Sequence, residues 1–174
     1  TSFGTMYDRP MVLVKLTDED DLAGVGEVWC NFPAVGAEHR ARLIESVFKP
    51  LLNGKLFDKP AEAFEFLTRK TWVLGLQTGE FGPMAQCIAG IDIALHDLMA
   101  RRDKTPLWKY LGGVSDSVKT YASGINPANA EKTAEMALEA GHNALKLKIG
   151  FDSAQDIQNI KSLRALLGEN GELM

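Results

Sequence analysis

The chain has 174 residues, of which 45% are hydrophobic and 24% are charged, and its formal net charge is −4 at pH 7. This is an ordinary globular composition, and the length suits one or two domains with cores of their own. The mild acidity and the lack of a basic run argue against nucleic acid and anionic membranes as partners. We find neither an apolar run of transmembrane length nor a secretory leader, which favours a cytoplasmic protein.

The first half of the sequence predicts a hairpin followed by helices. Residues 11–17 and 23–29 are β-rich runs on either side of a polar turn, a pattern typical of an antiparallel hairpin. Apolar residues at helical spacing then predict three helices, with a glycine-rich loop before the third. The first helix is expected over 37–52, the second from Pro60 to the start of the loop, and the third over 83–102. The loop is expected over 74–82. The predicted core stripe of the third helix consists of Met84, Ile88, Ile91, Leu95 and Leu98.

The second half has a different pattern, in which strands and helices alternate. The pair Gly112-Gly113 predicts a domain boundary, so we expect domains over 1–113 and 114–174. Alternation of this kind implies parallel strands joined by right-handed crossovers. The expected ranges are 117–123, 143–149 and 172–174 for strands, and 127–140 and 153–167 for helices. Because the last strand only begins before the final residue, we expect the chain to be part of a longer polypeptide.

The middle one of these strands carries two lysines. Lys146 and Lys148 share one face, since successive strand side chains alternate. The opposite face holds Leu145, Leu147 and Ile149, which we expect to pack on the flanking helices. In a β/α barrel, the inward face at the carboxyl end of a strand opens into the active site, where desolvation and mutual repulsion favour the neutral amine that a general base requires. The alternative is that both lysines lie on the solvated face of an edge strand.

Other candidate ligands and nucleophiles are few. His96 lies four residues after Asp92 in the helix over 83–102, so a metal or acid–base pair is conceivable. A packing pair on the helix is the preferred interpretation. Cys30 and Cys87 form no CxxC motif, and we interpret them as two buried or semi-buried thiols.

Two stretches resemble one known family. The run GIDIALHDLMAR over 90–101, continued by Thr105-Pro106-Leu107 and Leu111-Gly112-Gly113, resembles the signature helix of the mandelate racemase/muconate lactonizing enzyme branch of the enolase superfamily. The run KLKIG over 146–150 resembles the second barrel strand of that branch, whose Lys-x-Lys pair carries proton transfer. The resemblance extends over essentially the whole chain, as the N-terminal portion of such an enzyme.

The resemblance implies an α+β capping domain followed by the first β/α units of a modified TIM (β/α) barrel, incomplete in this chain. It implies an isomerase or lyase that abstracts the proton α to a carboxylate, with a divalent metal, normally Mg²⁺, stabilising the enediolate intermediate. The outcome would be racemisation or epimerisation, dehydration or cycloisomerisation of a small carboxylate by a homo-oligomer. The metal ligands are expected just beyond Met174, so none is assigned in this chain.

The resemblance also gives roles to individual residues. Lys148 would be the base. Lys146 would favour the neutral form of Lys148 and help to hold the substrate carboxylate. Ser123 matches a substrate-contacting position at the end of the first barrel strand. Two loops, over 1–9 and 28–35, match the capping loops that close over the pocket. The candidate contacts in these loops are Tyr7, Trp29 and Phe32.

Two alternatives stay open. A barrel enzyme could use one lysine to form a Schiff base with a carbonyl substrate. The chain could also be a non-catalytic, truncated fragment. The residues present do not determine which carboxylate is the substrate or which reaction follows proton removal.

Overall fold

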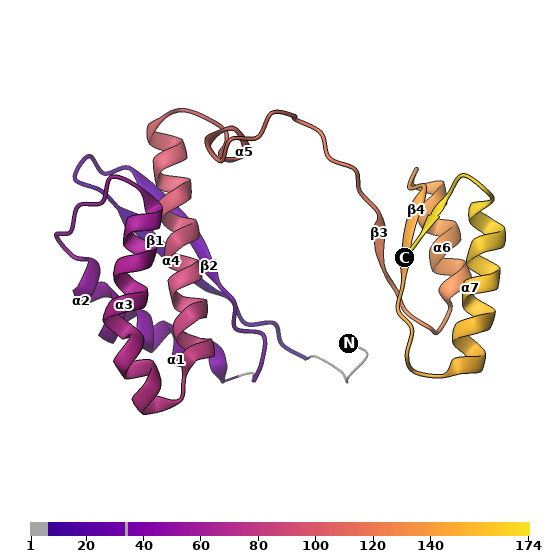
Figure 1. The fold of residues 1–174 in the computed structure, drawn as a ribbon, viewed down its shortest axis with the longest axis horizontal. Helices are drawn as coiled ribbons and strands as arrows, with labels where there is room; N and C mark the ends of the chain where they lie inside the picture. The colour runs from indigo at the N-terminus through magenta and orange to yellow at the C-terminus, as the bar shows by residue number, and fades with distance from the viewer. Residues whose placement is uncertain (1–6, 34) are drawn as a thin grey trace. The chain divides into compact units, whose positions relative to one another are not determined.

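Figure 1 shows the computed structural model, which describes residues 7–33 and 35–174. The chain divides into one compact unit within Thr5–Val114 and another within Ser115–Met174. Each unit has its own hydrophobic core. Of the two loops expected to cover a pocket, residues 1–6 and 34 lie outside the described residues. None of the helices in the described ranges has the length and apolar character needed to cross a membrane.

The first unit consists of a β-hairpin and a group of helices (Figure 1). Its elements are β1 (Val12–Thr17), β2 (Ala23–Val28), α1 (Gly36–Leu43), the π-helical segment η1 (Ile44–Phe48), α2 (Lys49–Leu52), α3 (Pro60–Thr78), α4 (Phe81–Arg102) and α5 (Leu107–Tyr110). The predicted hairpin is confirmed, since β1 and β2 pair antiparallel along their whole length. Both strands pack against α4, and α3 packs beside α4.

The core of this unit is built on α4. All members of the predicted stripe are buried, namely Met84, Ile88, Ile91, Leu95 and Leu98. Four of them, Met84, Ile88, Ile91 and Leu95, belong to one cluster with the fully buried Val28 of β2 and Leu67 of α3. The helical periodicity of the sequence therefore identified the face of α4 that is buried in the core.

Glycines allow β2 to lie very close to α4. A Cβ at Gly26 would overlap the carbonyl oxygen of Gly90, and a Cβ at Gly90 would overlap Cγ2 of Val28. The strand and the helix therefore meet backbone to backbone, where only a residue without a side chain fits. The position of the hairpin on the helix depends on this contact.

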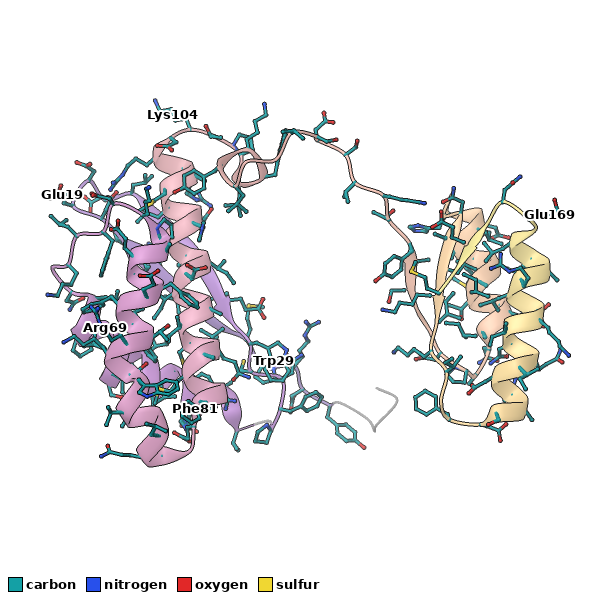
Figure 2. All side chains as sticks on the ribbon, in the orientation of Figure 1. Glu19, Trp29, Arg69, Phe81, Lys104 and Glu169 are labelled. Carbon is teal, nitrogen blue, oxygen red and sulfur yellow. The ribbon has the colours of Figure 1, made fainter. Side chains whose placement is uncertain are left out.

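The prediction of a loop over 74–82 is wrong, because only two residues separate α3 from α4. Gly75 lies inside α3 with the ring of Phe81 against it, and a Cβ there would lie 3.1 Å from Cδ1 of that ring. Phe81 is labelled in Figure 2, at the start of α4. Gly79, with a φ of +70°, ends α3 in the left-handed conformation that favours glycine at this position.

The helix predicted over 37–52 is present as α1, η1 and α2 in succession. Pro50 explains the π-helical middle segment. Proline has no N–H to donate, and its ring clashes with the carbonyl four residues earlier in a regular helix. The N–H of Lys49 accordingly bonds to the carbonyl of Ile44, five residues back.

Cys87 is expected to be chemically inert while the protein is folded. It is a fully buried free thiol, and burial raises its pKa to about 12, although the charge of Arg40 opposes this shift. The thiolate is the reactive form, so at about pH 8 very little of it is present. We expect iodoacetamide to leave Cys87 unmodified in the native protein and to modify it after denaturation, as measured by peptide mass spectrometry. Fast labelling of Cys87 in the native protein would contradict the burial.

The second unit is a parallel sheet with two helices on one side of it (Figure 1). Its elements are β3 (Ala122–Ile125), α6 (Ala130–Glu139), β4 (Ala144–Leu147), α7 (Ser153–Leu167) and β5 (Glu172–Leu173). The strand order is β3-β4-β5. The core joins strand residues Ile125, Leu145 and Leu147 to helix residues Ala134 and Leu163. The predicted strand–helix alternation is confirmed.

Two predicted strand boundaries differ from the structure. The strand expected over 117–123 begins at Ala122 and continues to Ile125, because this is the stretch that pairs with β4. The strand expected over 143–149 ends at Leu147, and Gly150 then turns the chain with a φ of +98°. Ile149 is 58% exposed, so the prediction that it packs against helices with Leu145 and Leu147 is wrong.

Candidate active site

The two lysines lie on the face of the sheet that the helices leave open. Lys146 and Lys148 are exposed, whereas Leu145 and Leu147 are buried against α6 and α7. In a β/α barrel the helices surround the sheet, so the face turned away from them is the inner one. Side-chain alternation along β4 and the residue after it therefore directs both ammonium groups to that face.

Lys148 contacts the carboxyl end of β3. Its backbone N–H donates to the carbonyl of Ile125 over 3.0 Å, which continues the β3–β4 pairing one residue beyond β4. Its Nζ donates to Oδ1 of Asn126 over 3.1 Å. Active sites of β/α barrels form at this end of the strands.

Lys146 contacts the other end of β3. Its Nζ lies 5.6 Å from the centroid of the Tyr121 ring, within the range of a cation–π contact. Tyr121 directly precedes β3, and Asn126 directly follows it. The two ammonium groups therefore lean in opposite directions along the same neighbouring strand.

Ser123 shares the face of the two lysines. Ala122 pairs with Leu145 and Ile125 pairs with Leu147, so β3 has one extra residue between these two pairs. Gly124, with a φ of +88°, takes up the extra residue as a bulge. Alternation from Ala122 then turns the exposed Ser123 away from the helices, beside Lys146.

The aromatic candidates Tyr7 and Trp29 belong to the first unit. Tyr7 is 91% exposed, and Trp29, which directly follows β2, is 48% exposed. The ring of Trp29 lies 6.3 Å from that of Phe32, centroid to centroid, at an interplanar angle of 58°. Figure 2 labels Trp29 beyond the end of the hairpin. The structure thus pairs Trp29 with Phe32, and all three rings have surface available for contact.

The sequence did not indicate Asn126 or Tyr121. The strand expected over 117–123 made Ser123 its last residue, whereas β3 ends at Ile125. Asn126 is therefore the polar residue at the carboxyl end of this strand. A correct strand boundary would have singled it out, because active-site residues of a β/α barrel come from that end.

The described residues do not supply a metal site. Within 7–33 and 35–174, no three His, Cys, Asp or Glu side chains come together as potential ligands of one ion. His96 and Asp92 lie on α4 with Nδ1 and Oδ2 3.5 Å apart, and Nδ1 is 2.9 Å from the Asp92 backbone carbonyl oxygen. This is a local contact within one helix.

Comparison with known proteins gives a consistent result. Residues 1–112 match the family model described as mandelate racemase / muconate lactonizing enzyme, N-terminal domain. The crystal structure of a mandelate racemase/muconate lactonizing enzyme from Bordetella bronchiseptica RB50 is 55% identical with a TM-score of 0.91, over 97% of this chain and 46% of that one. A racemase from Streptomyces coelicolor A3(2), crystallised with bound magnesium, is 28% identical with a TM-score of 0.81, over 94% of this chain and 49% of that one. The 3,6-anhydro-alpha-L-galactonate cycloisomerase of Streptomyces coelicolor is 30% identical, over 100% of this chain and 48% of its own length.

The matches place the chain in the enolase superfamily as its class of protein, in agreement with an α+β unit followed by parallel β/α units. The chain belongs to the mandelate racemase / muconate lactonizing enzyme family. It contains the α+β capping fold and an incomplete barrel, which confirms the resemblance and the fold class inferred from the sequence. The chain spans about half the length of the curated relatives it matches. Those relatives are isomerases and lyases, named as cycloisomerases, dehydratases, epimerases and racemases.

Proposed function

We propose that the complete protein abstracts the proton α to the carboxylate of a small organic acid, with Lys148 as the base. The observation that carries this proposal is the position of Lys148 Nζ, on the helix-free face at the carboxyl end of β4 and 3.1 Å from Asn126 Oδ1. A lysine amine there is an apt proton acceptor. The names of the relatives support the proposal, because racemisation, epimerisation, dehydration and cycloisomerisation can all begin by removal of this proton.

Lys146 and Ser123 are our proposed substrate-binding residues in the second unit. An ammonium group on the same face as the base attracts the substrate carboxylate by a charge-assisted hydrogen bond. The hydroxyl of Ser123 supplies a further donor on that face. From the first unit, we propose Tyr7 and Trp29 as contacts that cover the substrate, which their exposed rings support.

The proposal extends to the organisation of the complete protein. Residues 1–113 are assigned to the capping domain and residues 114–174 to the start of the barrel, and the division of the chain between Val114 and Ser115 supports this boundary. We propose Mg²⁺ as the cofactor, supported by the relative solved with magnesium. Its ligands would come from outside the described residues, and the roles proposed for the two lysines do not depend on it. We also propose a cytoplasmic homo-oligomer.

The test is hydrogen exchange by the complete enzyme in deuterium oxide. The first probes are 3,6-anhydro-L-galactonate and arabinonate, the compounds in the names of two relatives, followed by galactarate and Ala-Glu dipeptides. We expect loss of the α-proton NMR signal of at least one probe, either because deuterium replaces that proton or because elimination converts the probe to product.

Borohydride trapping in parallel tests the Schiff-base alternative. We expect no covalent adduct on Lys146 or Lys148 after treatment with borohydride and pyruvate, a 2-oxo acid whose ketone can condense with a lysine amine. An adduct on either lysine without α-hydrogen exchange would replace proton abstraction by Schiff-base chemistry. A complete enzyme that removes the α proton of none of the probes and forms no adduct would count against both functions.

A further inference from the structure

We infer that Asn126 is a positioning residue for Lys148, and that Asp156 and Asn159 of α7 hold the two loops that carry this pair. The inference rests on the proposed role of Lys148 as the base. It adds residues that the Lys-x-Lys pattern does not contain.

Asn126 orients the side chain of Lys148. A lysine side chain has a flexible four-carbon stem, so an exposed Nζ has no fixed direction of its own. The 3.1 Å hydrogen bond to Oδ1 of Asn126 gives it one. An amide oxygen is also neutral. A carboxylate at the same place would favour the charged ammonium and so disfavour the neutral amine that a base must offer. Asparagine therefore orients Nζ without that penalty.

Asn159 holds the loop that begins with Asn126. Asn159 is buried in α7, and both of its polar side-chain atoms are engaged. Its Nδ2 donates to the carbonyl of Pro127 over 3.0 Å, while its Oδ1 accepts from Nε2 of Gln155 over 2.9 Å. Pro127 directly follows Asn126. Because the ring of proline fixes its φ, holding its carbonyl restricts the direction in which the chain leaves β3.

Asp156 holds the loop that begins with Lys148. Asp156 is 8% exposed, and its Oδ2 accepts from the N–H of Gly150 over 2.7 Å, two residues beyond Lys148. Its Oδ1 is buried and has no hydrogen-bond partner among the described residues. A buried carboxylate oxygen without a partner costs stability. The bond that Asp156 supplies in return fixes the loop that begins at the base.

The two supports come from one turn of α7. Asp156 and Asn159 are three residues apart and so lie on the same face of the helix. Each holds one of two successive loops, one after β3 and one after β4. A single rigid element therefore sets the distance between Asn126 and Lys148.

The test exploits the neutrality of Asn126. In the complete enzyme with carbon-13-labelled lysine, Asn126→Asp should raise the pH midpoint of the Lys148 NMR signal by about one unit or more, because the added carboxylate favours the ammonium. The rate of α-hydrogen exchange near neutral pH should fall about tenfold with it. The NMR signal that is lost in Lys148→Arg is the signal of Lys148. Other charged groups near this sheet include Lys146, Asp152, Asp156, Arg164 and the Lys119–Glu172 ion pair, and the variant leaves them unchanged.

Asn143→Asp is the matched control. Asn143 is exposed and precedes β4 at its opposite end. The same added charge is then five residues from Lys148, roughly 16 Å at ~3.3 Å per strand residue, which exceeds the Debye length of about 8 Å at physiological salt. We expect an unchanged Lys148 midpoint. Equal midpoints in both variants and in the wild type would overturn the inference for Asn126.

The supports are tested by a pair of variants at Asp156. Asp156→Ala removes the acceptor for Gly150 and should lower the exchange rate about tenfold or more, since misplacement of a reacting group is costly. Asp156→Asn keeps an acceptor and should restore most of the rate. If the charge at the start of α7 were what matters, both variants would lose stability together and exchange at the wild-type rate, and the support role would be wrong. Should Asp156→Ala fail to fold, Asn159→Ala, which frees the carbonyl of Pro127, replaces it with the same expected loss.

Lys148→Ala separates failure of this inference from failure of the proposed function. Exchange abolished in Lys148→Ala but normal in Asn126→Ala would refute only the positioning role. Normal exchange in Lys148→Ala would refute the function on which the inference rests.

Discussion

Replacing Lys148 with alanine in the complete enzyme is expected to lower α-hydrogen exchange by ~10²–10⁴-fold, the usual range for the loss of a general base. The fold should survive. Lys148 is exposed and lies outside the buried cluster between the sheet and its helices, and surface substitutions of this kind usually change stability by about 0.5 kcal/mol or less. Isotope exchange reports the proton transfer itself, and thermal unfolding followed by circular dichroism reports the fold.

Lys148→Arg makes this experiment sharper. Arginine keeps the positive charge and most of the length, but its guanidinium stays protonated and cannot accept a proton. We therefore expect it to fail almost as badly as alanine. Lys132→Ala is the control, because Lys132 is exposed on α6, away from the lysine face. Wild-type exchange in Lys148→Arg would show that charge at this position matters and that the base lies elsewhere.

Gly90→Ala is expected to destabilise the first unit strongly. The added methyl group would overlap Cγ2 of Val28 and approach the Val28 backbone N and Cα at 3.2 Å. Val28 is fully buried, so it has no free space into which to move. Overpacking of a core typically costs ~1–3 kcal/mol, and a clash with a strand backbone belongs at the upper end or above it. Urea denaturation, with the midpoint and slope fitted together, measures the loss.

Gly82→Ala is the matched control in the same helix. No atom lies within 4 Å of a Cβ at Gly82, which is in the first turn of α4. Alanine is the better helix former by roughly 0.5–1 kcal/mol, but Pro83 follows directly and disfavours the helical conformation of a preceding residue that carries a Cβ, so this variant should lie close to the wild type in stability. Gly90→Ala is thus expected to be much the more destabilising of the two variants. Similar losses in both would mean that the contact between β2 and α4 is not what Gly90 provides.

Local patterns predicted the parts of the fold whose side chains repeat with a fixed period. The α4 stripe from Met84 to Leu98 has the helical period and is buried as expected. The alternation around Lys146 predicted the open face of β4, since Leu145 and Leu147 are buried on the other side. Each of these predictions depends only on the geometry of one element, which the sequence contains directly.

Features that depend on two elements meeting were not predictable in this way. Gly75 and Gly79 suggested a loop, but Gly75 is a helical residue that makes room for the ring of Phe81. The contact of Asn126 with Lys148 depends on the register between β3 and β4, which the bulge at Gly124 shifts by one residue. No local pattern records such a shift, because it is set by the partner strand.

Asp156 and Asn159 have a consequence for how the second unit moves. A displacement of α7 as a rigid body carries the Pro127 carbonyl and the Gly150 amide along together, because both are bonded to the same helical turn. We therefore expect the motions of the two loops to be correlated, so that the gap between Asn126 and Lys148 is kept while the direction in which the pair points can vary. Substitutions at exposed positions on α7, such as Gln158 and Lys161, could therefore act on the lysine through the position of the helix. Substitutions that tilt the helix there would re-aim the lysine without altering any residue that faces it.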